Sequence, residues 1–181
     1  EIVWTPPAQT SVDELGWFVM VQKKDYQGAI NALSRAVASG FYAPEDLPRR
    51  YKALAQLNYE LKQYPKTVEY GKKAIELAPA NPSILYAAGT GLTEVDEWDE
   101  GIAFVRESAR LNPNHPTYRY MYLAIDSMMS GDYATALVES TIFDRRFEFW
   151  GPLLHGLALD GLGHTDEARR EIEIAKAVIA L

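Results

Sequence analysis

The stretch Trp98-Asp99-Glu100-Gly101-Ile102 is one of five similar stretches whose spacing decides the fold. The other four cover residues 25–30, 64–68, 133–137 and 165–169. In each, an aromatic or polar residue stands three positions before a small residue, and the small residues are Ala29, Thr67, Gly101, Ala136 and Ala168. The successive separations are 67 − 29 = 38, 101 − 67 = 34, 136 − 101 = 35 and 168 − 136 = 32 residues. A period of this length is typical of a repeated helix–turn–helix unit.

The sequence between these anchors predicts helices. Apolar positions in Tyr51–Leu61 mostly recur every three or four residues, which places them along one side of a helix. Start signals are a capping box at residues 11–14 and a proline in first helical position in Asn81-Pro82 and His115-Pro116. Pro79 and Pro113 predict helix ends, because the residue before a proline is pushed out of the helical region.

With these features the chain resembles the tetratricopeptide repeat, a helical hairpin of 34 residues. The matching positions are Tyr51, Leu54, Ala55, Tyr64, Ala74 and Pro79; Leu85, Gly89, Trp98, Ala109 and Pro113; Tyr120, Leu123, Ala124, Gly131, Asp132, Tyr133 and Ala136; and Gly156, Gly163, Ala168 and Ala175. The resemblance implies an all-α fold, a right-handed α-solenoid of about five antiparallel helix–turn–helix repeats. We expect an extended, proline-rich lead-in at 1–10 and one repeat domain at 11–181, with units near 11–46, 48–80, 82–114, 116–148 and 149–181.

Small residues at the repeat's eighth, twentieth and twenty-seventh positions are expected to let neighbouring helices approach closely. Three residues depart from the family pattern: Trp17 and Phe143 occupy small positions, and Gly71 stands where an aromatic residue is usual. The fourth unit is therefore expected to pack differently around Phe143.

Composition excludes several classes of function. The 181 residues are 48% apolar, enough to bury a core, and the net charge of 18 − 25 = −7 argues against a general nucleic-acid binder. The absence of cysteine excludes disulfides, cysteine-bound zinc, iron–sulfur clusters and thiol nucleophiles. No apolar stretch approaches the roughly 18 residues of a membrane span, so we expect no membrane insertion.

No group of residues in the sequence predicts catalysis, a metal or a cofactor. His115, His155 and His164 fall at a helix start, a helix and a turn of the repeat frame, where structural roles are expected. Gly89-Thr90-Gly91 lies inside a predicted helix and lacks the strand of a dinucleotide site. The acidic residues from Glu94 to Glu100 lack the pattern of a calcium loop and are expected at a solvated turn. The sequence therefore predicts a protein that is not an enzyme.

The family resemblance implies a concave groove lined by the second, fifth, ninth and twelfth residues of each first helix. Counting these positions gives candidate partner-binding residues with a basic end and an aromatic, methionine-rich end: Arg49, Lys52, Tyr59, Tyr86, Tyr118, Met121, Met128 and Trp150. The other interpretation is that Met121, Ile125, Leu153 and Leu157 only pack between units. Lys52 matches one position of the carboxylate clamp in chaperone-binding family members, but Gln56 replaces its asparagine, so we do not predict that activity.

The expected function is that of a non-enzymatic adaptor or scaffold that binds a peptide or protein segment. Ala168, Ile172, Ala175 and Ile179 form one apolar stripe of the last helix, and Ile174, Val178 and Leu181 form a second. A second copy of the chain or adjacent repeats could cover these end faces. Two alternatives stay open: a repeat region of a larger protein or envelope-assembly machine that docks through its ends, or a carbohydrate-binding groove using the 12% aromatic residues. The missing cysteine and initiator methionine favour a bacterial periplasmic location over a cytoplasmic one, without deciding it.

Overall fold

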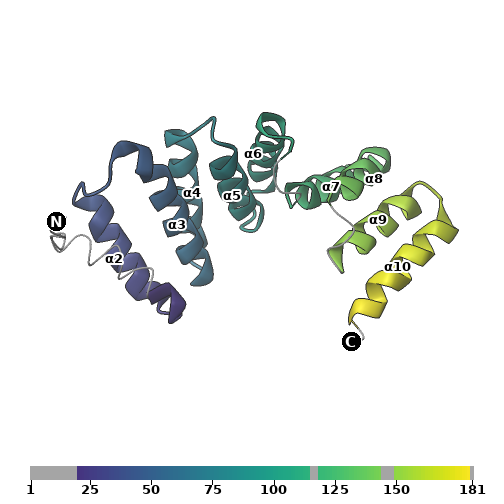
Figure 1. The fold of residues 1–181 in the computed structure, drawn as a ribbon, viewed down its shortest axis with the longest axis horizontal. Helices are drawn as coiled ribbons and strands as arrows, with labels where there is room; N and C mark the ends of the chain where they lie inside the picture. The colour runs from purple at the N-terminus through teal and green to yellow at the C-terminus, as the bar shows by residue number, and fades with distance from the viewer. Residues whose placement is uncertain (1–19, 115–117, 144–148, 180–181) are drawn as a thin grey trace, which may run out of the picture. The chain divides into compact units, whose positions relative to one another are not determined.

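The computed structural model describes residues 20–114, 118–143 and 149–179. All regular structure in these residues is helical, which confirms the predicted all-α fold (Figure 1). The lead-in, the capping box at 11–14, Trp17, the His115-Pro116 start and Leu181 lie outside the described residues. The elements are α2 (Tyr26–Ala38), the 3-10 helix η1 (Pro44–Asp46), α3 (Leu47–Glu60), α4 (Tyr64–Leu77), α5 (Pro82–Thr93), α6 (Trp98–Leu111), α7 (Arg119–Met129), α8 (Tyr133–Ile142), α9 (Trp150–Gly161) and α10 (Thr165–Ile179).

The chain divides into two compact units, residues 1–101 and 102–181, with the division inside α6. In the first unit α2 packs on α3, α3 on α4 and α4 on α5, and the successive first helices α3 and α5 also touch. In the second unit α7, α8, α9 and α10 pack in the same sequential manner, with α7 touching α9. Each unit is therefore a row of helical hairpins.

Every hairpin turns through one residue in the left-handed backbone region. These residues have φ between 57° and 80°, and they are Lys24, Lys62, Asp96, Gly131 and Gly163. Their separations are 62 − 24 = 38, 96 − 62 = 34, 131 − 96 = 35 and 163 − 131 = 32 residues. The same four numbers separate the small residues in the sequence, so the predicted repeat period is confirmed.

The residue after each left-handed position donates a backbone hydrogen bond to a carbonyl five residues earlier, which closes a Schellman motif. The N···O distances are 2.8 Å for Asp25 to Met20, 2.8 Å for Gln63 to Asn58, 3.2 Å for Glu97 to Leu92, 2.8 Å for Asp132 to Ser127, and 2.9 Å for His164 to Leu159. Asp25 and Asp132 also cap the next helix, since their carboxylates accept from the backbone N–H of Gly28 and Thr135 at 2.9 and 3.1 Å. One helix thus ends and the next begins within three or four residues.

The predicted helix boundaries at proline are confirmed. Asn81 caps α5 by accepting from the backbone N–H of Ser83 and Ile84 at 3.0 and 3.3 Å, and Pro82 is the first helical residue. The helices before Pro79 and Pro113 end at Leu77 and Leu111. The connections between these hairpins are therefore set by local sequence.

Small residues allow close helix contact, as expected. A Cβ added to Gly101 of α6 would lie 2.6 Å from the Gly89 carbonyl oxygen and 2.7 Å from the Thr93 backbone nitrogen. A Cβ on Gly156 of α9 would lie 2.9 Å from Ile172 Cγ1 of α10. The core cluster of the first unit forms between α2 and α3, around the buried side chains of Leu33, Leu54 and Leu57.

Buried polar groups support the second unit. The Arg119 guanidinium, buried at the start of α7, donates to the carbonyls of Ser108 and Asn112 at 2.7 and 2.8 Å. Ser127 Oγ donates to the buried Glu139 carboxylate at 2.7 Å, and burial raises the pKa of Glu139 while this bond opposes the rise. Phe143 is buried directly after α8, which has 10 residues against 14 in α4. The fourth unit therefore departs from the pattern where the sequence predicted it.

The left-handed turns predict that glycine is favoured at two of these positions, so introducing it at one and removing it at the other should have opposite effects. Lys62→Gly should stabilise the protein by about 0.5–1 kcal/mol, because glycine avoids the left-handed penalty but increases the entropy of the unfolded chain. Gly163→Ala should destabilise it by about 1 kcal/mol although its Cβ would meet no atom within 4 Å, since the cost lies in the backbone. Urea denaturation measures both, and equal effects of the same sign would contradict the role of these turns.

Two helical glycines should also respond oppositely to alanine. Gly101→Ala should destabilise by about 1–3 kcal/mol, because backbone atoms of the facing helix must move. Gly91→Ala should stabilise by about 0.5–1 kcal/mol, because its Cβ would meet no atom within 4 Å and alanine favours the helix. Thermal and urea unfolding of the two variants provide the comparison; a stabilised Gly101→Ala would contradict the close helix contact.

Candidate functional site

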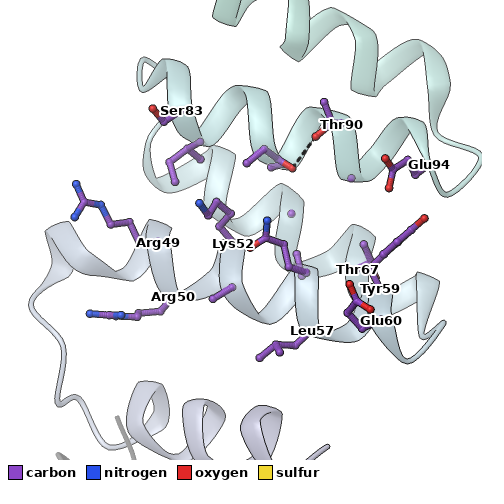
Figure 2. A pocket seen from close by; sticks show the side chains of 18 of the residues that line it. Arg49, Arg50, Lys52, Leu57, Tyr59, Glu60, Thr67, Ser83, Thr90 and Glu94 are labelled. Atoms are coloured by element: carbon purple, nitrogen blue, oxygen red, sulfur yellow. Dashed lines mark hydrogen bonds between the residues drawn. The ribbon is translucent and has the colours of Figure 1, made fainter. Parts of the chain in front are cut away.

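A groove of about 790 Å³ lies in the first unit, between the first helices α3 and α5, with α4 beneath them. Small and apolar residues form much of its lining, including Ala55, Gly71, Ile84, Ala87 and Ala88. Figure 2 shows charged and polar side chains distributed along its length. The groove therefore has a surface of small residues and a polar end on each side of it.

Three cations line one end of the groove, and all come from the first two turns of α3. They are Arg49, Arg50 and Lys52, and Figure 2 shows them on the side of the groove where Ser83 begins α5. The guanidinium of Arg50 lies 4.4 Å from the centre of the Tyr42 ring. The positive charges at this end of the groove would attract a negatively charged group of a ligand.

Two carboxylates and a phenol line the other end. Glu60 is the last residue of α3, Glu94 caps the end of α5, and Tyr59 stands beside them (Figure 2). The negative charge of Glu94 raises the pKa of the Tyr59 hydroxyl, because it disfavours the phenolate, and a hydrogen bond between the two side chains adds to this effect. Tyr59 and Glu94 therefore interact at this end of the groove.

The groove lining also includes a glycine and hydroxyls that already have acceptors. Gly91 lines it with open space where a side chain would begin, since an added Cβ meets no heavy atom within 4 Å. Thr90 Oγ1 donates to the Ala87 carbonyl at 3.3 Å, and Thr67 Oγ1 donates to the Gln63 carbonyl at 3.4 Å. The Thr67 and Thr90 hydroxyls therefore already have backbone acceptors nearby in the chain. Among the described residues, no histidine lines this groove.

The structure brings together three of the predicted site residues, Arg49, Lys52 and Tyr59. Tyr86 of α5 does not line the groove. At about 100° per residue along α5, it lies about 110° from the centre of the sector formed by the lining residues Ser83 to Glu94. Counting positions along the repeat identified α5 as a helix of the groove. Tyr86, however, lies on a different side of α5 from the residues that line the groove.

The remaining predicted residues belong to the second unit and therefore lie outside the groove of the first unit. Tyr118 and Trp150 are 44% and 50% exposed at the starts of α7 and α9. The Tyr118 ring contacts Phe143 with a centroid distance of 6.1 Å. Met121 and Met128 are half-buried on α7.

Among the lining residues that sequence reasoning did not assign to the groove are Arg50, Glu60, Gly91 and Glu94. Glu60 and Glu94 stand at helix ends, and the implied positions, which end at Tyr59 and Thr93, stop one residue before each of them. A signal was available, because each precedes a left-handed turn residue by two positions: 62 − 60 = 2 and 96 − 94 = 2. The open space at Gly91 has no counterpart in the sequence pattern.

The described histidines lie in separate places. His155 Nδ1 is 3.2 Å from Ser140 Oγ, and His164 Nδ1 is 3.5 Å from Glu167 Oε1 beside the last turn. In residues 20–114, 118–143 and 149–179, no three side chains of the metal-ligating types are gathered into one group. None of the helices described there is long and apolar enough to cross a bilayer.

Successive helical hairpins, each turned through a left-handed residue and packed through small residues at a period near 34, define the tetratricopeptide-repeat fold. The chain has this fold. No protein-family model matches the sequence, and no curated protein matches it.

Solved structures support the same fold. The chain is similar to the MamA protein, with a TM-score of 0.75, 19% identity, and coverage of 93% of this chain and 91% of that one. It is also similar to YrrB, described as a TPR protein with an unusual peptide-binding site, with a TM-score of 0.70, 13% identity, and coverage of 90% and 82%. BtubC (BKLC) from P. vanneervenii gives a TM-score of 0.76 at 14% identity, with coverage of 96% and 80%. At these identities the likeness shows the fold.

The pair of Tyr59 and Glu94 predicts a change in tyrosine ionisation. Glu94→Gln should lower the pKa of Tyr59 toward its ordinary value of 10.0, because the nearby negative charge is removed. NMR titration of ring-labelled tyrosine measures this, with Tyr59→Phe assigning the signal and Glu76→Gln as the control. An unchanged Tyr59 pKa in Glu94→Gln would contradict the contact.

Proposed function

We propose that this protein is a non-enzymatic adaptor that binds an extended peptide or protein segment in the groove between α3 and α5. The supporting observation is the groove itself, with Arg49, Lys52 and Tyr59 along a floor of small residues. It follows α3 from Arg49 to Glu60, and 60 − 49 = 11 residues at about 1.5 Å each gives roughly 16 Å. An extended segment of about five residues has this length, at roughly 3.3 Å per residue.

The chemistry of the lining suits a peptide backbone. Gln56, Asn81 and Ser83 line the groove with amide and hydroxyl groups, which both donate and accept hydrogen bonds. Small residues such as Gly91 and Ala87 let a second backbone approach closely. Together these groups can bind main chain without requiring one particular side chain.

The same lining favours binding over catalysis. The Thr67 and Thr90 hydroxyls donate to carbonyls of their own helices, whereas a nucleophile needs an adjacent base. Arg49 and Lys52 are suited to binding a carboxylate through charge-assisted hydrogen bonds. The peptide-binding site in the description of YrrB, which has the same fold, further supports the proposal.

In this proposal the predicted residues of the second unit provide a second contact area. Tyr118 and Trp150 present half-exposed rings, and aromatic side chains of this kind are favoured anchors in protein interfaces. Met121 and Met128, half-buried on α7, would let this second surface adapt to the partner that it contacts.

A side chain placed at Gly91 tests the groove directly. Gly91→Phe should weaken peptide binding at least tenfold, because the ring enters open space in the groove without displacing the fold. The probe is the tightest peptide selected from a random 12-residue phage library on the wild-type protein. Fluorescence anisotropy with the labelled peptide gives the dissociation constants.

Gly91→Ala is the matched control and should bind within about threefold of the wild type, with its helical circular dichroism retained. Equal binding by wild type and Gly91→Phe would exclude the groove as the site. Failure of the library to yield any peptide that binds the wild type would contradict the peptide-binding function.

A further inference from the structure

The charges that line the groove are separated by sign. Arg49, Arg50 and Lys52 line one end and Glu60 and Glu94 line the other (Figure 2). Within the part of the chain that the structure describes, these five are the lining residues that carry full charge at neutral pH. Figure 2 also shows that α3 and α5 run in the same direction along the groove, from Arg49 to Tyr59 and from Ser83 to Glu94. Their helix dipoles therefore point the same way and add to the side-chain charges.

This arrangement opposes the usual electrostatics of a helix, which favours acidic residues at its start and basic residues at its end. Arg49 and Arg50 are the third and fourth residues of α3, whose first turn contains no acidic residue, and Glu60 is its last. Glu94 caps the end of α5, whose last turn contains no basic residue. Glu45 and Asp46 precede α3, but neither lines the groove.

The second helices of two hairpins follow the usual rule. Asp99 and Glu100 lie in the first turn of α6, and Arg110 lies in its last turn. Asp166 and Glu167 begin α10, and Lys176 lies in its last turn. On α4, by contrast, Lys66 lies in the first turn and Glu76 in the last, so reversed charges also occur outside the groove. The groove differs in that charges of both signs line it, at opposite ends.

Tyr59, in the last turn of α3, interacts with Glu94 at the end of α5, so both helices contribute to the acidic end. At the other end, three cations within four residues of α3 give a local excess of positive charge.

We propose that the partner is an extended segment with acidic residues at one end and basic residues about five positions away. The acidic residues contact Arg49 and Lys52, and the basic residues contact Glu60 and Glu94. The spacing follows from the roughly 16 Å between the charged ends of α3, at about 3.3 Å per residue of ligand. This inference rests on the proposed peptide-binding function and specifies its ligand.

The experiment begins with the peptides that the random library yields on the wild-type protein. They should carry Asp or Glu near one end and Lys or Arg about five residues away. The tightest is synthesised in three forms: as selected, with its acidic residues changed to lysine, and with its basic residues changed to glutamate. The selected form should bind at least tenfold more tightly than either uniformly charged form.

Variants that reverse the charge at one end of the groove should change which of the three peptides binds most tightly. Glu94→Lys should weaken the selected peptide at least fivefold and strengthen the all-acidic form, while Arg49→Glu should strengthen the all-basic form. A peptide with the acidic and basic residues in the reverse order should not restore binding to these variants, because the two ends of each variant groove no longer carry charges of opposite sign. Both residues are exposed and both changes follow the helix dipole, so the fold should be retained, as circular dichroism would verify.

Matched controls are Glu76→Lys and Lys66→Glu, exposed positions of α4 outside the groove, which should leave the order of the three peptides unchanged. Selected peptides without the charge pattern, or variants that keep the wild-type order, would overturn the separated charges as the recognition feature while peptide binding stands. A library that yields no binding peptide would overturn both.

Discussion

The hydrogen bond that closes each hairpin is the constraint on which the rest of the structure depends. It joins the backbone N–H after a left-handed residue to a carbonyl five residues earlier, as between Gln63 and Asn58 at 2.8 Å. Because the chain reverses within three or four residues, two helices lie side by side and antiparallel. Their small residues then meet at matching heights, as Gly101 does with Gly89. Without this reversal the small residues would have no facing helix.

The same turns shape the groove. Glu60 and Glu94 each stand two residues before a left-handed position, so equivalent turns bring both carboxylates to one end. The first turns of α3, one helix length away, supply the cations. The separation of charge along the groove therefore follows from the repeat. The first helices of neighbouring hairpins, α3 and α5, begin at one end of the groove and end at the other.

Much of the fold could be predicted from the sequence, because spacing and proline positions are local signals. The separations of the small residues from Ala29 to Ala168 equal those of the left-handed residues, and α5 begins at Pro82 as expected. The turn positions themselves were harder to recognise, because Lys24, Lys62 and Asp96 occupy them without being glycine. For the site, counting positions along the repeat gave Arg49, Lys52 and Tyr59, which line one groove. It could not exclude Tyr86 or find Glu94, because the direction in which α5 faces and the place where it ends depend on packing against neighbouring helices.

The lengths of the connections bear on how such a chain changes over evolutionary time. Inside the hairpins, the loops between α3 and α4, α7 and α8, and α9 and α10 each have three residues, and any insertion there would break the bond that closes the turn. Between hairpins, residues 39–46 separate α2 from α3 and include η1, whereas residues 78–81 suffice between α4 and α5. The connections inside hairpins, including the four residues between α5 and α6, thus vary in length less than those between hairpins. A gene built this way can gain or lose whole hairpins by recombination, and residues 39–46 offer a natural place to insert a reporter or a second domain.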